Sequence, residues 1–304
     1  MKLHLYNSYK REKESFEPIK DGYVGLYTCG PTVYDYAHIG NFRTFIFEDL
    51  LKRWLIHLGY DVKHIMNITD VDDKTIKKAN DESVALNIIT DRYTSCFMED
   101  LKWLKMIPAD EFPRATDYID KMISMIQTLL DKNFAYKDND GSVYFDINSF
   151  QEYGCLTNLN IKGQKQTKRI NDDEYDKDSP QDFALWKGWK EEDGDIVWNA
   201  PWGKGRPGWH IECSAMSLKY LGDGFEIHGG GRDLIFPHHE NEIAQSESFT
   251  SKQFAKIWMH VGMITINGEK MSKSVGNVKS VNHVLGDWGP NIIRLFCLSG
   301  SYSK

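Results

Sequence analysis

A strand, a helix and a second strand near the start of the chain constrain its fold more than any other feature. Residues 23–29 (YVGLYTC) alternate apolar with β-favouring side chains and end at a Gly-Pro turn, which predicts a strand. Apolar residues from Phe42 to Trp54 recur with helical periodicity and predict a helix that ends at Gly59. Residues 60–68 predict the second strand. A helix joining two strands in so short a stretch makes the strands parallel, so we expect an α/β fold with ligands at the strands' carboxyl ends.

A glycine-rich stretch, 225–242 (FEIHGGGRDLIFPHHENE), carries a second set of signals. Residues 225–228 predict a short strand that breaks at three consecutive glycines, 229–231. Glycines let the backbone approach a ligand closely, because no Cβ stands in the way. A helix is predicted to begin at Pro237, since proline is favoured in the first helical turn.

That predicted helix carries half of a possible metal site. His238 and Glu242 lie four residues apart and so share one face of a helix. His239 has an apolar residue at the same offset, so we expect it to point toward apolar packing. Cys29 and Cys213 are available to complete a set of four ligands. Taken alone, a histidine and a carboxylate at this spacing are more often a solvated helix end.

Two other stretches suit phosphate. The helix start at 38–41 (HIGN) presents free N–H groups and a partial positive charge. Lys270 and Lys273, in the pentapeptide KMSKS, follow an Asn-Gly hairpin-turn signal at 267–268 and can clamp a polyphosphate as point charges. Either stretch alone would favour an ordinary surface loop, but the two together are highly specific.

Composition sets the remaining limits. The chain has 304 residues and a composition typical of a globular protein, enough for two domains, and no apolar run approaches the length of a bilayer span. Five cysteines, an odd number with no export signal, favour reduced thiols or metal ligands and the cytoplasm. The net charge of -7 neither indicates nor excludes a nucleic-acid partner, because binding depends on local patches.

The change of pattern along the chain predicts its organisation. Helical segments such as 119–130 alternate with polar loops after the first βαβ unit, and 168–178 is highly charged. We interpret this part as an insertion that splits a Rossmann-like parallel sheet. The predicted units are a first half of the nucleotide fold at 1–90, an α+β connective insertion at 91–197, the second half at 198–262, and the KMSKS loop with the start of a helical region at 263–304.

The paired signatures HIGN and KMSKS resemble those of class I aminoacyl-tRNA synthetases. The surrounding strings are similar to one family in particular, cysteinyl-tRNA synthetase, and they run in order over nearly the whole chain: YTCGPTVYDYAHIGNFRTF (27–45), NITDVDDK (67–74), GWHIECSAM (208–216), IHGGGRDLIFPHHENEIAQS (227–246) and EKMSKSVGN (269–277).

The resemblance implies a reaction in two steps. Cysteine attacks the α-phosphorus of ATP to give cysteinyl-adenylate and pyrophosphate, and the cysteinyl group then passes to the terminal adenosine of tRNA(Cys). ATP would bring Mg²⁺. A cytoplasmic monomer with no membrane contact is expected.

The resemblance also implies roles for particular residues. His38, Lys270 and Lys273 would be catalytic, with the two lysines closing on the phosphates. The nucleotide would contact Gly40, Asn41, Gly230, Asp233 and Lys273, although Asp233 could instead hold the amino group of cysteine. Asn41 stands where the family signature has histidine. The residues that would form the amino-acid pocket are Gly30, Thr69, Trp209 and His228.

A zinc ion is implied at Cys29, Cys213, His238 and Glu242. Serine differs from cysteine by one atom, and an apolar pocket separates such near-isosteres by only about 10–200-fold. Zinc prefers a soft thiolate and lowers its pKa, so it can reject serine. Two thiolates and a carboxylate on Zn²⁺ already sum to one negative charge, and the thiolate of the substrate would add another. We expect that this charge is offset by nearby donors, among them His38, His210 or His228, or by a weaker Glu242 bond.

Two alternatives stay open at this point. A cysteine ligase of the mycothiol type would keep the chemistry and transfer cysteine to an amino sugar. A zinc-stabilised RNA-binding protein would lack catalysis, but it would have no need of a KMSKS loop. The chain ends at Lys304 where the family continues into an anticodon-binding region, so we expect either a fragment or a short enzyme that activates cysteine but charges tRNA poorly.

Overall fold

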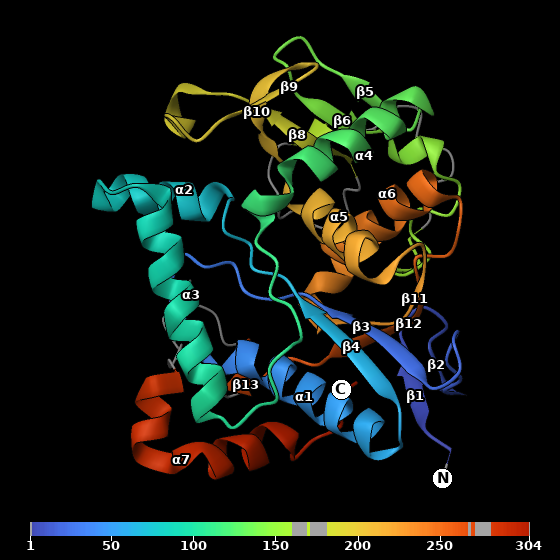
Figure 1. Ribbon diagram of the computed structural model, residues 1–304, viewed down its shortest axis with the longest axis vertical. Coiled ribbons are helices and arrows are strands. Elements are labelled where there is room, and N and C mark those ends of the chain that lie inside the picture. The colour runs from blue at the N-terminus through green and yellow to red at the C-terminus, as the bar shows by residue number, and fades with distance from the viewer. Residues whose placement is uncertain (1, 160–168, 171–180, 267–268, 271–280, 304) are drawn as a thin grey trace.

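A four-stranded parallel sheet forms the centre of the molecule. The structure is a computed structural model that describes residues 2–159, 169–170, 181–266, 269–270 and 281–303. The strands run in the order β12-β11-β3-β4, and each adjacent pair is parallel. Their bounds are β3 Tyr23–Thr28, β4 Asp61–Met66, β11 Phe225–Gly231 and β12 Ala255–Val261. The sheet order therefore places β3 beside β11, although they come from opposite halves of the chain (Figure 1).

Helices cover both faces of this sheet. α1 (Ile39–His57) lies on one side, and α5 (Trp209–Leu221) and α6 (Glu240–Thr250) lie on the other (Figure 1). Because side chains alternate along a strand, Leu26 belongs to the apolar cluster of α1 while Tyr27 belongs to the cluster of α5 and α6. Cys29 follows Tyr27 by two residues and belongs to the same cluster as α5 and α6.

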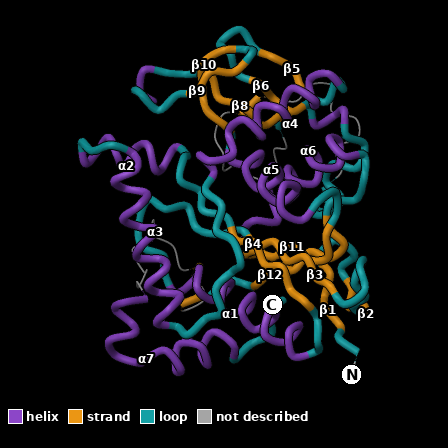
Figure 2. Tube along the Cα trace, viewed as in Figure 1, coloured by secondary structure: helices purple, strands orange, loops and turns teal. Residues whose placement is uncertain are grey.

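A smaller sheet lies beyond α5 and α6 (Figure 2). Its main path is β5-β6-β8-β10-β9, all antiparallel neighbours, and β7 pairs with β8 in parallel. The bounds are β5 Ala135–Lys137, β6 Val143–Phe145, β7 Arg169–Ile170, β8 Asp182–Gly188, β9 Trp198–Ala200 and β10 Gly203–Pro207. Residues 198–207 therefore pair within the smaller sheet, and we propose that the inserted unit continues to about Gly208 instead of ending at 197.

The other described elements surround these two sheets. The strands are β1 His4–Asn7, β2 Glu12–Ser15, β13 Thr265–Ile266 and β14 Glu269–Lys270, and the helices are α2 Asp73–Glu82, α3 Leu86–Trp103, α4 Ile119–Asp131 and α7 Val281–Leu298. Short 3-10 turns occupy Ala115–Tyr118, Ile147–Ser149, Glu191–Asp193 and Arg232–Leu234, and a π-helical turn occupies Ile235–His239. Within the part of the chain that the structure describes, no helix has the length and apolarity that crossing a membrane requires.

The predicted βαβ unit is confirmed by β3, α1 and the parallel partner β4. The expected helix at 119–130 is confirmed by α4. The predicted break at the glycines is wrong: β11 continues through Gly231, because Gly229, Gly230 and Gly231 each pair with a residue of β12. The turn at 267–268 lies outside the described residues, and the strands on either side of it pair antiparallel.

Candidate active site and metal centre

The carboxyl end of β3 meets α5 and α6 in a buried polar cluster. Cys29 follows β3, Cys213 lies on α5, and Glu242 lies on α6. The Sγ atoms of the two cysteines are 3.9 Å apart, and Cys29 Sγ is 3.7 Å from Glu242 Oε1. These three side chains are almost entirely buried, and a buried carboxylate such as Glu242 needs a charged, hydrogen-bonding or metal partner.

His238 completes a first set of donors with Cys29, Cys213 and Glu242. One potential ligand atom from each of the four residues lies within 4.8 Å of all the others. His238 Nε2 is 2.9 Å from Glu242 Oε1, so the spacing predicted from a shared helix face brings these two groups together. Two thiols, an imidazole and a carboxylate are ligands that Zn²⁺ accepts, so the residues fit this metal.

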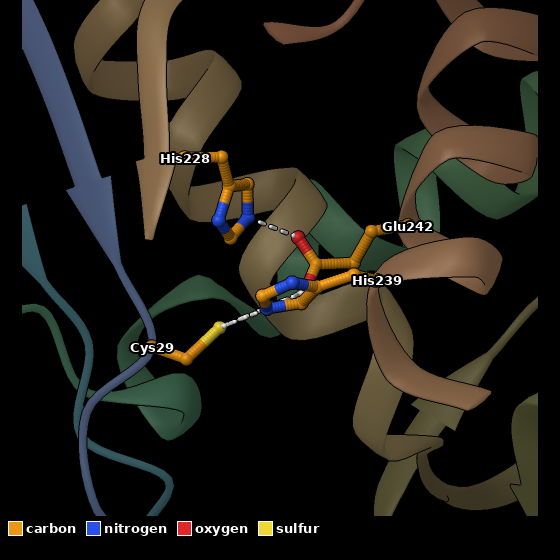
Figure 3. A group of neighbouring side chains, drawn as sticks. All are labelled: Cys29, His228, His239 and Glu242. Carbon is orange, nitrogen blue, oxygen red and sulfur yellow. Dashed lines mark hydrogen bonds and ion pairs between the residues drawn. The ribbon is translucent and has the colours of Figure 1, made fainter. Parts of the chain in front are cut away.

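A second set of donors shares Cys29 and Glu242 with the first (Figure 3). His228 Nε2 lies 2.8 Å from Glu242 Oε2, and His239 Nε2 lies 3.3 Å from Cys29 Sγ. This set has one thiol instead of two, so it is the harder of the two donor sets.

The predicted apolar surroundings of His239 are wrong. Its Nδ1 lies 2.7 Å from His260 Nε2, and its Nε2 faces Cys29, so both ring nitrogens have polar neighbours. The turn at Ile235–His239 is π-helical and contains Phe236 in a non-helical conformation. A wider turn rotates the side chains away from the positions that regular α-helical spacing gives them, so His238 and His239 both reach the cluster.

Neighbouring charges govern the protonation of the first set. Burial alone would raise the pKa of Cys213, but the Cys29 hydrogen bond and His238 outweigh it and bring the pKa to about 6. Burial would lower the pKa of His238, but Glu242 and Cys213 raise it to about 10. The pKa of the Cys29 thiol is raised well above its usual value, mainly by burial and to a smaller extent by the contact with Cys213. A metal ion that binds here therefore displaces protons from His238 and Cys29.

The neighbours of His238 fix its orientation. Its ring stacks on Trp209 with centroids 4.0 Å apart, and its Nδ1 lies 2.9 Å from His210 Nδ1. Burial lowers the pKa of His210 well below its usual value, so this ring is neutral and can accept the proton of His238 Nδ1. Such a bond leaves Nε2 of His238 directed to the remaining donors, as in many zinc sites.

An open cavity of about 450 Å³ adjoins the cluster. Among the residues predicted to bind substrates or catalyse the reaction, those that line it are Gly30, His38, Gly40, Asn41, Trp209 and Asp233. His38 and Asn41 form the N-terminal cap of α1, with Asn41 N donating to His38 Nδ1 and His38 N donating to Asn41 Oδ1. The cavity therefore extends from a buried thiol, Cys29, to a helix N-terminus.

The other residues predicted to bind substrates or catalyse the reaction do not line the cavity or lie outside the described residues. Thr69 and His228 are fully buried and do not line the cavity, and the neighbouring Gly231 lines it instead of Gly230. The backbone of Lys270 lies in β14, and Lys273 lies outside the described residues.

Three residues near the site did not stand out in the sequence. His260, on β12, contacts His239, and Glu212 accepts a hydrogen bond from Thr69. Lys74 lines the cavity. Lys74 lies in the string NITDVDDK and Glu212 in GWHIECSAM, so these strings contained a signal, but periodicity could not assign the residues a role.

Solved structures with this architecture define its class. The methionyl-tRNA synthetase of Mycobacterium tuberculosis, in complex with methionyl-adenylate, matches with a TM-score of 0.70 and 15% identity over 91% of this chain and 64% of that one. A putative arginyl-tRNA synthetase from Campylobacter jejuni matches with a TM-score of 0.62 and 14% identity over 92% of this chain and 64% of that one. The fold is therefore that of the class I aminoacyl-tRNA synthetases.

The family is more specific. Residues 15–304 match the family described as tRNA synthetases class I (C) catalytic domain, and the chain belongs to it. It is 52% identical over 304 residues to the cysteine–tRNA ligase of Chlamydia muridarum and 48% identical over 302 residues to that of Thermococcus kodakarensis, covering 99% of this chain in both cases. The chain spans 64% and 63% of the length of these two relatives.

Proposed function

We propose that this chain activates L-cysteine with ATP to form cysteinyl-adenylate and transfers the cysteinyl group to tRNA(Cys). The observation that carries the proposal is the cavity that runs from Cys29, which lies beside the second buried thiol of Cys213, to the N-terminus of α1. The donor set suits a thiol substrate and the helix N-terminus suits phosphate. The relatives named cysteine–tRNA ligase favour tRNA as the acceptor over an amino sugar.

Cys29, Cys213, His238 and Glu242 would hold one zinc ion. This set has two soft thiol donors and a histidine oriented by His210, whereas the set with His228 and His239 has one thiol. Bound zinc would supply a Lewis-acidic position that favours a substrate thiolate over a serine hydroxyl. His228, which contacts Glu242 Oε2, would withdraw negative charge from that carboxylate.

The nucleotide would lie at the other end of the cavity. Gly40 and Asn41 would contact the nucleotide at the first turn of α1, where a phosphate is favoured by the helix dipole. His38 is held beside them by its cap, and Asp233 would bind the ribose or the amino group of cysteine. Lys270 and Lys273 would neutralise the leaving pyrophosphate, with Mg²⁺ bound to ATP.

Cysteine-dependent ATP–pyrophosphate exchange tests the activation step. The zinc-loaded chain should catalyse exchange with cysteine, should not do so with serine, and should lose activity when zinc is removed by a chelator. Addition of tRNA(Cys) to the same protein then tests the transfer. Exchange with serine at a comparable rate, or full exchange after complete zinc removal, would contradict the role of the metal.

A further inference from the structure

A line of hydrogen bonds joins the residue after Cys29 to the residue before Cys213. Gly30 N donates to Asn67 Oδ1 at 3.0 Å, and Asn67 Nδ2 donates to Thr69 Oγ1 at 3.2 Å. Thr69 Oγ1 in turn donates to Glu212 Oε2 at 3.0 Å. The line thus runs from the end of β3, through the segment after β4, to α5.

The side chains in this line are almost completely buried. Asn67 and Thr69 are each 1% exposed and Glu212 is 0% exposed, and none of the three lines the cavity of the candidate site. Burying such polar groups is unfavourable unless they are hydrogen-bonded. Loss of one bond in the line therefore leaves a buried polar atom without a partner and favours a shift of the neighbouring side chain. Thr69 is also held through its backbone, because its N–H donates to Pro31 O and its carbonyl accepts from Val33 N.

The line has little freedom at either end. A Cβ on Gly30 would lie 1.8 Å from the carbonyl oxygen of Asn67, so the backbone beside Cys29 rests directly on residue 67. At the other end, Glu212 and Cys213 are adjacent in α5. Adjacent residues of a helix keep a fixed angle about its axis, so a bond that holds Glu212 in one direction also sets the direction of Cys213. The positions of the two thiols are therefore coupled through Thr69.

We propose that Thr69 and Glu212 are positioning residues that hold Cys29 and Cys213 at the spacing that a metal ion requires. This role rests on the proposed metal site. It differs from the expectation that Thr69 contacts the amino-acid substrate directly. Residues that orient metal ligands typically change metal affinity by about 10–100-fold when they are replaced.

The test compares Thr69→Val, Glu212→Ala and Glu212→Gln. Valine keeps the shape of threonine without its hydroxyl, whereas glutamine keeps an oxygen that can accept from Thr69. Glu226→Ala is the control, because Glu226 is also a buried carboxylate but accepts from Ile19 N and Gly25 N at the far end of β3. Co²⁺ affinity is measured on metal-free protein from the thiolate-to-cobalt absorption band, together with the midpoint of urea unfolding and the KM values for cysteine and ATP.

We expect Thr69→Val and Glu212→Ala to weaken Co²⁺ binding by about 10–100-fold and to raise the KM for cysteine more than that for ATP. Glu212→Gln should restore most of the affinity, and Glu226→Ala should lower the unfolding midpoint without changing the Co²⁺ affinity of the folded protein. If Glu212→Ala does not fold, Thr69→Val decides the question.

Wild-type Co²⁺ affinity in Thr69→Val would overturn the proposal. So would a Glu226→Ala variant that loses as much Co²⁺ affinity as Thr69→Val when the two variants are equally destabilised. The parent chain separates this result from failure of the proposed function. A parent that binds Co²⁺ but catalyses no exchange refutes the activity and leaves the positioning test valid, whereas a parent that binds no Co²⁺ refutes the metal site and this role with it.

Discussion

The thiols of Cys29 and Cys213 lie 3.9 Å apart although 184 positions separate them in the chain. β3 ends one residue before Cys29, and α5 packs against the same face of the sheet. Two thiols at this distance in a buried site repel each other once both are ionised. A divalent cation removes that repulsion, so the relationship between these two residues favours a metal.

The two donor sets make opposite predictions for single substitutions. If the first set binds the ion, Cys213→Ser and His238→Asn should each weaken Co²⁺ binding by more than about 100-fold, because each removes a ligand. His228→Asn and His239→Asn should each weaken it by less, about 10–100-fold, as expected for residues that only orient ligands. Titration of metal-free protein with Co²⁺ measures all four affinities.

Cys29→Ser is the common control for these variants, since Cys29 belongs to both sets and its loss should always weaken binding. The reverse order of effects, with His228→Asn and His239→Asn more damaging than Cys213→Ser, would assign the ion to the second set.

Close packing at Gly30 gives a prediction about stability. Because an added Cβ would meet the Asn67 carbonyl oxygen at 1.8 Å, Gly30→Ala must displace backbone and should lower the free energy of unfolding by at least about 2 kcal/mol. Gly300→Ala is the matched control, because its Cβ would meet only the end of Arg43 at 3.5 Å. Urea unfolding of both variants is the measurement, and equal stabilities would show that the backbone at Gly30 adjusts freely.

Local patterns in the sequence were sufficient for the elements that depend on local contacts. β3, α1 and α4 follow from alternation and helical periodicity, because the apolar side chains that they bury recur at the spacing of a strand or a helix. The extension of β11 through three glycines could not be predicted in this way. It depends on pairing with β12, which is a contact between distant segments.

The candidate site divides in the same manner. The closeness of His238 to Glu242 follows from their spacing, but the approach of Cys29 to Cys213 depends on β3 lying beside β11, which periodicity cannot show. The sequence itself showed only that both cysteines were available as ligands, and the resemblance to a known family assigned them to one zinc site. The position of His239 was missed because regular α-helical geometry does not describe a π-helical turn.

Asn41 has a structural role that its position in the HIGN signature did not reveal. Its side chain accepts from His38 N at 3.1 Å, and its own N–H donates to His38 Nδ1, which caps α1. Asn41→Ala should therefore lower the free energy of unfolding by about 1 kcal/mol, whereas Asn41→Asp, which keeps the acceptor oxygen, should lower it less. Urea unfolding measures both, and an unchanged Asn41→Ala variant would mean that the cap contributes nothing.

Glu48 should make stability fall as pH rises. It lies on α1, its side chain is fully buried, and burial raises the pKa of its carboxyl from 4.5 to about 8, although nearby Thr28 offsets part of the effect. Between these two pH values the unfolded chain has released the proton and the folded chain retains it. The free energy of unfolding therefore decreases by up to about 1.4 kcal/mol per pH unit in this window, and the decrease is complete above pH 8.

Glu48→Gln removes this titration while keeping the size of the side chain. Urea unfolding at pH 5 and at pH 8.5 measures the free energy of unfolding of the variant and the wild type. The difference between them should shift in favour of the variant at the higher pH, by several kcal/mol at most. Leu51→Ala, a large-to-small change in the core of the same helix, should lower stability by a similar amount at both pH values. If the difference between Glu48→Gln and the wild type is the same at both pH values, the Glu48 carboxyl is not held protonated in the folded protein, and another group must bind its charge within the core.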